Sequence, residues 1–91
     1  MTVSVECIVF RCRKQEEMYL YLRADLNTAE LPQALLKMTG HLTPVMNLDL
    51  APARKLARVD VAQVIGALRE TGYFLQMPPD GRIKAHLYSG D

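Results

Sequence analysis

A cluster of basic side chains is the clearest candidate for binding chemistry in this sequence. Arg54, Lys55 and Arg58 lie close together in a stretch rich in Ala and Pro. Guanidinium and ammonium groups form charge-assisted hydrogen bonds with carboxylates and phosphates, so the cluster suits an acidic protein segment or a phosphate group. The structural alternative is that these side chains form exposed ion pairs with Asp49 and Asp60, each worth about 1 kcal/mol or less.

A pair of tyrosines offers a second binding chemistry. Tyr19 and Tyr21 alternate along a predicted strand and share one of its faces with Arg23. Aromatic rings on a sheet can stack on nucleic-acid bases, as in sheet-type RNA-binding domains. The structural alternative is that the two rings cover the core and keep their hydroxyl groups in water. Both interpretations stay open from the sequence.

Metal-binding and redox patterns are weak along the chain. A metal site needs several ligands close together, but His41 and His86 are isolated and neither pairs with a cysteine at ligand spacing. Cys7 and Cys12 are five residues apart on a predicted strand. This odd spacing places them on opposite faces and disfavours a disulfide between them. We therefore expect no metal and no cofactor, and we interpret both cysteines as small buried hydrophobic residues.

Catalytic motifs are equally weak. Ser4 and Ser89 have no glycine-rich elbow around them, and the sequence contains neither a Walker loop nor a GxGxxG motif. Asp60 is better explained as a helix N-cap, worth about 1 kcal/mol, than as an acid or base. An enzyme is therefore the weaker functional class. A small-molecule site would need a pocket with convergent polar groups, which a sequence does not show.

The length and composition describe one small globular domain. The chain has 91 residues, of which 49% are apolar and 23% are charged, and its net charge is +1. Nucleic-acid-binding domains usually carry a clear basic excess, which is absent from this sequence. The sequence shows no secretory signal and no apolar run long enough to cross a bilayer. We expect a cytoplasmic protein with reduced thiols and no membrane partner.

Hydrophobic periodicity predicts four strands. Residues 3–12 are apolar on both faces near their middle, which is typical of a central strand covered on two sides. Residues 18–23 alternate apolar and polar side chains and follow a short polar turn, so they predict a hairpin. Residues 43–50 and 73–77 form two further strands, and Pro44 belongs near the start of the first or on a sheet edge.

Two helices are predicted between these strands. The first is short, covers about residues 32–38 and ends at Gly40. The second begins at Asp60, which forms a capping-box pattern with Gln63, and ends at Gly72. The resulting order is strand, strand, helix, strand, helix, strand. This order predicts an α+β domain with a mixed four-stranded sheet and helices on both faces, because a central strand with two apolar faces needs a cover on each.

Several segments together resemble the YcgL domain family. They are Tyr19-Leu-Tyr21, Leu48-Asp-Leu50 ahead of Arg54-Lys-Leu56, Asp60 at a helix start, and above all Gly72-Tyr-Phe-Leu-Gln-Met-Pro-Pro79. The resemblance runs from about Cys7 to Pro79 and implies a small bacterial cytoplasmic domain with an α/β/α sandwich. It implies no biochemical activity and supplies no catalytic residues. We expect the domain to occupy residues 3–79, followed by a tail at 80–91 that departs from the family pattern and either docks a short helix or frays.

The resemblance and the basic cluster together define one candidate binding surface. Its residues are Arg54, Lys55, Arg58, Tyr73, Gln76, Pro78 and Pro79. In the functional interpretation these side chains line a recognition groove. In the structural interpretation the Gln76 amide ties a sheet edge, and the two prolines end a strand by removing backbone donors.

The leading hypothesis for function is a non-enzymatic protein-binding or adaptor domain of unknown partner. One alternative is an RNA-binding accessory protein that uses the Arg54, Lys55 and Arg58 cluster or the face with Tyr19 and Tyr21. A second alternative is a small-molecule enzyme. We expect a monomer or a weak dimer, since an uncovered strand can pair with its copy across a dimer.

Overall fold

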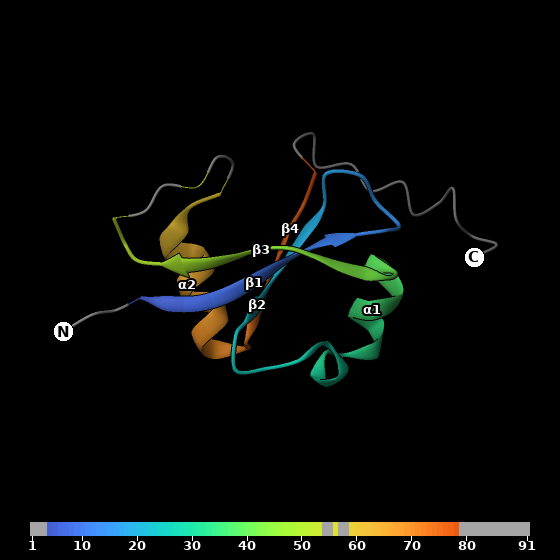
Figure 1. Ribbon diagram of the computed structural model, residues 1–91. Helices are drawn as coiled ribbons and strands as arrows, with labels where there is room; N and C mark the ends of the chain where they lie inside the picture. Colours follow the sequence, from blue (N-terminus) through green and yellow to red (C-terminus); the bar gives the residue numbers. More distant parts are fainter. Residues whose placement is uncertain (1–3, 54–55, 57–58, 79–91) are drawn as a thin grey trace.

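A computed structural model describes residues 4–53, 56 and 59–78 (Figure 1). The elements follow the predicted order and confirm the α+β class. They are β1 (Val5–Cys12), β2 (Tyr19–Arg23), the short 3-10 helix η1 (Thr28–Glu30), α1 (Gln33–Thr39), β3 (Leu42–Leu50), α2 (Val61–Glu70) and β4 (Tyr73–Gln76). Among these residues, no helix is long and apolar enough to cross a membrane.

The four strands form one sheet in the order β3-β1-β2-β4, with β1 in a central position. Every neighbouring pair is antiparallel, so the sheet is antiparallel throughout rather than mixed. The reason lies in the connections. β2 and β3 both run opposite to β1 and therefore run parallel to each other, but β1 lies between them. The crossover through α1 thus joins two parallel strands that are not neighbours.

The alternation of side chains along β1 divides the core into two parts on opposite faces of the sheet. Val5, Cys7 and Val9 pack with Val64, Leu68 and other apolar residues beneath α2. Phe10 and Cys12 pack on the other face with apolar residues of β2 and α1. The helices therefore cover both faces, as predicted. In Figure 1, α2 lies beside the start of β1 and α1 lies beside its end.

The helix ends follow the signals in the sequence. The Asp60 side chain accepts a hydrogen bond from the Ala62 backbone N–H at 3.1 Å and so caps α2. Gly40 follows α1 with φ +70° and Gly72 follows α2 with φ +94°, both in the left-handed region that favours glycine. A Cβ at Gly72 would also overlap the Leu26 side chain. Two features therefore favour glycine at position 72: the left-handed backbone and the close approach of Leu26.

β3 is an irregular edge strand. Its register with β1 shifts between Val9 and Phe10, because Met46 pairs with Val9 whereas Pro44 pairs with Phe10. Val45 is the extra residue of this bulge. Pro44 lies on an edge strand, as predicted, where the sheet tolerates a residue without an N–H.

A buried hydrogen bond ties β4 to β2. The Tyr21 hydroxyl donates to the Gln76 Oε1 at 2.8 Å, and both side chains are buried. The Tyr21 ring also meets Phe74 edge-on, with ring centroids 6.0 Å apart. The amide of Gln76 therefore ties the edge strand β4 to the sheet.

We expect Tyr21→Phe to lower the free energy of unfolding by about 1–3 kcal/mol, because it leaves a buried amide oxygen without its donor. Urea denaturation measures this loss. Tyr19→Phe is the matched control, since Tyr19 lies on the same face of β2 and its hydroxyl has no partner within the described part of the chain. Equal losses of unfolding free energy in the two variants would contradict a stabilising role for the hydrogen bond between Tyr21 and Gln76.

Candidate functional site

The sequence-predicted binding surface is only partly within the described structure. Arg54, Lys55, Arg58 and Pro79 lie outside the described residues, so their placement in a binding surface stays a prediction. The structure places the remaining three members, which are Tyr73, Gln76 and Pro78.

Two of these three members, Tyr73 and Gln76, lie on opposite faces of the sheet. Tyr73 packs on the face of the sheet that α1 covers. Gln76 lies opposite Tyr19 on the other face, is buried and accepts the hydrogen bond from Tyr21. Pro78 is buried as well. The odd spacing between positions 73 and 76 on a strand requires opposite faces, and the sequence itself carries this signal.

The predicted stacking face of β2 is covered. Tyr21 is 6% exposed and packs beneath α2, so it presents no ring for a base to stack on. The Arg23 side chain on the same face already has hydrogen-bond partners within the domain. Its Nη1 donates to the Leu68 carbonyl oxygen at 2.9 Å, near the C-terminus of α2, and its Nε donates to the Asp25 carboxylate at 2.6 Å. Both rings therefore pack against the core, as in the structural interpretation, but the Tyr21 hydroxyl is buried against Gln76 rather than kept in water.

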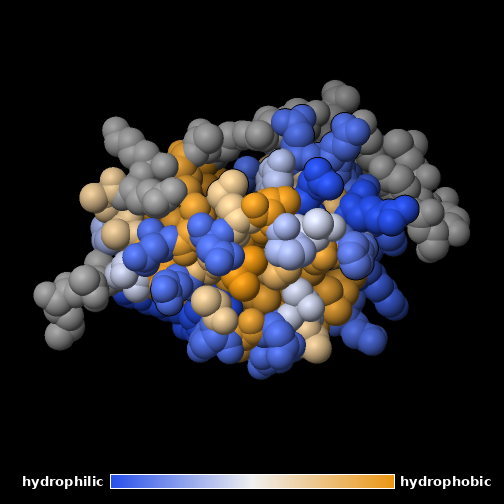
Figure 2. All heavy atoms as spheres, viewed as in Figure 1, coloured by the Kyte–Doolittle hydropathy of each residue, from blue (hydrophilic) through white to orange (hydrophobic). Residues whose placement is uncertain are grey.

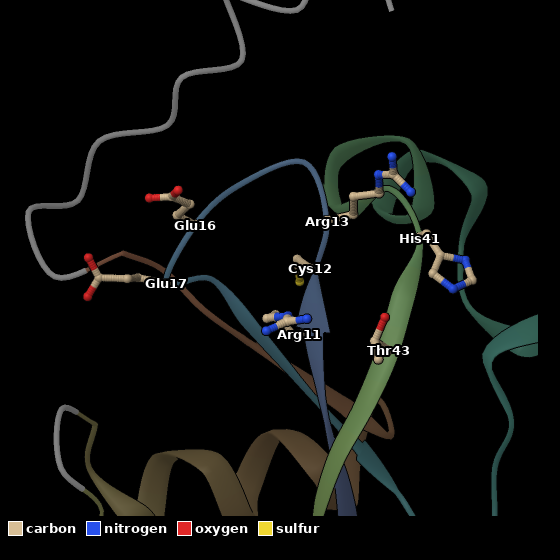
Figure 3. Close-up of a pocket in the computed structure, with 7 residues that line it drawn as sticks. All are labelled: Arg11, Cys12, Arg13, Glu16, Glu17, His41 and Thr43. Atoms are coloured by element: carbon tan, nitrogen blue, oxygen red, sulfur yellow. The ribbon is translucent and has the colours of Figure 1, made fainter.

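One shallow concavity of about 560 Å³ lies at the end of β1, beyond the reach of α2 (Figure 3). Arg11 pairs with Thr43 in the sheet, and a backbone hydrogen bond of 3.0 Å joins the Arg13 N–H to the His41 carbonyl oxygen. Figure 3 shows Arg13 and His41 on one side of β1 and the carboxylates of two glutamates on the other. Those glutamates are Glu16 and Glu17.

Charged side chains and one buried thiol line this concavity. Burial raises the pKa of the Cys12 thiol to about 11, so the thiol is protonated at neutral pH and is a poor nucleophile. Within the described residues, no group of three His, Cys, Asp or Glu side chains could hold a metal ion. The two arginines and two glutamates give this surface both signs of charge.

A second concavity of about 380 Å³ lies diagonally opposite, on the face that α1 covers and at the start of β1. Glu6 on β1 is the direct cross-strand neighbour of Asp49 on β3, and both side chains are exposed. Asn47 and Ile8 form the next pair on the same face of the two strands. No Lys, Arg or His lines this concavity among the described residues. It is therefore an acidic hollow on the sheet.

The edge of the sheet beside this hollow is exposed and partly apolar. Within the described residues, β3 pairs only with β1, so its other edge carries backbone groups without a strand neighbour. Val45 is 43% exposed and Met46 is 53% exposed, and both belong to β3. Figure 2 shows hydrophobic surface over the middle of β3 between hydrophilic areas. The acidic hollow and this edge adjoin each other along β3.

Comparison with known proteins gives a consistent family match. Residues 7–79 match the YcgL domain. A YcgL domain-containing protein of Hahella chejuensis is 44% identical over 71 residues, which cover 78% of this chain and 67% of the relative. One of Cellvibrio japonicus is 38% identical over 77 residues, covering 85% and 79%. The protein YcgL of Salmonella arizonae is 36% identical over 86 residues, covering 92% and 78%. These names state no biochemical function.

We expect Glu6→Gln and Asp49→Asn each to raise the free energy of unfolding by about 0.2–1 kcal/mol, because like charges directly opposite on neighbouring strands destabilise a sheet. The double variant should gain little more than either single one, since either substitution removes the repulsion. Urea denaturation at low and high ionic strength measures the effect, which salt should diminish. Glu16→Gln is the control, and a loss of stability in the Glu6 and Asp49 variants would contradict the repulsion.

Proposed function

This chain belongs to the YcgL domain family, and we propose that it is a non-enzymatic protein-binding domain whose docking element is the exposed edge of β3. In this proposal an extended segment of a partner protein adds to the sheet as a further strand. The single observation that carries the proposal is that the exposed edge strand also holds both exposed large hydrophobic side chains of the described residues.

The backbone of β3 supplies the affinity in this binding mode. An edge strand presents a row of N–H and C=O groups that a second strand can pair with, and many peptide-binding domains use such an edge. β3 is nine residues long, which is longer than the average strand. Natural proteins commonly shorten, cover or twist away long exposed edges because they promote unwanted association. A long edge that is left exposed therefore suits a binding role.

The irregular part of β3 limits the length of the strand with which a partner can pair. Pro44 offers no N–H, and the bulge at Val45 bends the strand. From Met46 to Leu50 the register with β1 is regular. We assign this five-residue stretch as the docking segment. Met46 at its beginning and Val45 just before it then contribute apolar contacts, since their side chains are exposed before binding.

The proposal includes a cytoplasmic location. Cys7 and Cys12 lie on opposite faces of β1, one in each core, so they do not form a disulfide with each other. Buried thiols of this kind are typical of proteins in a reducing compartment.

A photo-reactive residue in place of Val45 tests the proposal in living cells. We expect it to form a covalent adduct with a distinct protein, whereas the same residue at Gln33, an exposed position on α1, should not. The adduct is identified by mass spectrometry, and the purified partner is then titrated. Hydrogen exchange should show protection of β3 amides in the complex. Adducts from both positions alike, or a complex without β3 protection, would contradict the proposal, and an adduct between two copies would identify a dimer instead.

Truncation of the exposed methionine gives a second test with the identified partner. We expect Met46→Ala to weaken binding by roughly fivefold, because burying about half of a methionine side chain is worth about 1 kcal/mol. Isothermal titration calorimetry measures the dissociation constant. The melting temperature should change little, since Met46 is 53% exposed in the unbound domain. The control is Met38→Ala, which removes a methionine that packs against the core beneath α1 and should lower stability without acting on the docking edge.

A further inference from the structure

The two faces beside the β3 edge differ in chemistry, and we infer from them that the partner segment alternates basic and apolar residues. This inference rests on the proposed function, because it concerns the same docking edge. It specifies what the partner must present, which strand addition alone does not determine. Main-chain hydrogen bonds give affinity in this binding mode, whereas the side chains on each face select the sequence.

The first face is acidic. Asp49 and Asn47 of β3 share this face with Glu6 and Ile8 of β1. The carboxylates of Asp49 and Glu6 are cross-strand neighbours, and no cation lines their concavity among the described residues. A partner strand beside β3 would place its own side chains about 5 Å from those of Asp49 and Asn47, within reach of an ion pair. A Lys or Arg at that position offsets the repulsion between the two carboxylates.

The second face is apolar. Met46 and Leu48 of β3 lie on the side of the sheet that α2 covers, opposite Val9 and Cys7 of β1. Leu48 packs against the core, whereas Met46 is not part of that core and is 53% exposed. A partner residue opposite either side chain would bury apolar surface. Leu, Ile, Val or Met therefore fits these positions.

The alternation of side chains along a strand allows one segment to present basic groups to one face and apolar groups to the other. Successive side chains on a strand point to opposite faces, so a partner that meets Met46 and Leu48 with apolar groups meets Asn47 and Asp49 with the residues between them. The fitting segment therefore repeats an apolar residue and a basic residue in turn. A second copy of this chain fits less well, because pairing two β3 strands gathers Glu6 and Asp49 of both copies on one face without a cation among the lining residues.

Three synthetic peptides, each as long as β3, test the charge requirement directly. They alternate Leu with Lys, Leu with Gln, or Leu with Glu, and they share every other feature. We expect the Lys peptide to bind roughly tenfold more tightly than the Gln peptide at low ionic strength, and the Glu peptide to bind most weakly. The difference between the Lys and Gln peptides should shrink as salt is added. Fluorescence anisotropy measures the affinities, and hydrogen exchange locates the bound peptide.

Variants of the domain and of the peptide assign the effect to the two carboxylates and to strand addition. Glu6→Gln combined with Asp49→Asn should abolish the preference for Lys over Gln. Glu16→Gln removes an acidic charge from the other concavity and should keep that preference. A Lys peptide with methyl groups on alternate backbone nitrogens should lose binding, since it cannot donate the hydrogen bonds of a strand.

The outcomes separate the inference from the function on which it rests. Equal binding of all three peptides with protection of the β3 amides would overturn the basic requirement and leave β3 as a docking edge. A Lys preference that survives the Glu6 and Asp49 substitutions would overturn the assignment of these carboxylates. Peptide binding without protection of β3, or protein that dimerises through β3 and excludes the peptides, would overturn both the inference and the proposed docking element.

Discussion

The burial of β1 on both faces is the constraint on which the rest of the structure depends. A strand of eight residues extends over about 27 Å, whereas helices of seven and ten residues reach only about 10 Å and 15 Å. Neither helix can cover its face of the sheet from end to end. α2 covers the start of β1 on one face and α1 covers its end on the other. Two diagonally opposed corners of the sheet therefore stay exposed, and the two concavities lie there.

The sequence of β1 follows this diagonal arrangement residue by residue. Its two charged residues are Glu6, on the face of α1 but at the end that α1 leaves bare, and Arg11, on the face of α2 beyond the end of that helix. At both positions a charge stays in water, whereas an apolar residue there would add exposed hydrophobic surface. The position of each charge within an apolar strand thus indicates where the covering helix stops, and the amino-acid sequence alone carries this signal.

Local patterns predicted the elements well, and contacts between distant residues were harder to predict. The double apolar face of β1, the cap at Asp60 and the glycines at helix ends rest on neighbouring residues, and the structure has each of them where it was predicted. The antiparallel direction of all strand pairs and the hydrogen bond between Tyr21 and Gln76 depend on residues far apart in the chain. Hydrophobic periodicity carries no information about such pairings.

In the proposed binding mode, the acidic pair Glu6 and Asp49 affects two competing associations. An exposed edge strand invites pairing with any other edge, and charge beside it is a common protection against self-association. Glu6 and Asp49 repel a second copy of the same edge, and the same two carboxylates favour a cationic strand. Specificity of this kind comes from a repulsive element as much as from an attractive one. The repulsion within the unbound domain costs a few tenths of a kcal/mol to about 1 kcal/mol, a small part of the roughly 5–15 kcal/mol that is typical of folded domains. The acidic pair that the proposal assigns to this edge is therefore compatible with a stable fold.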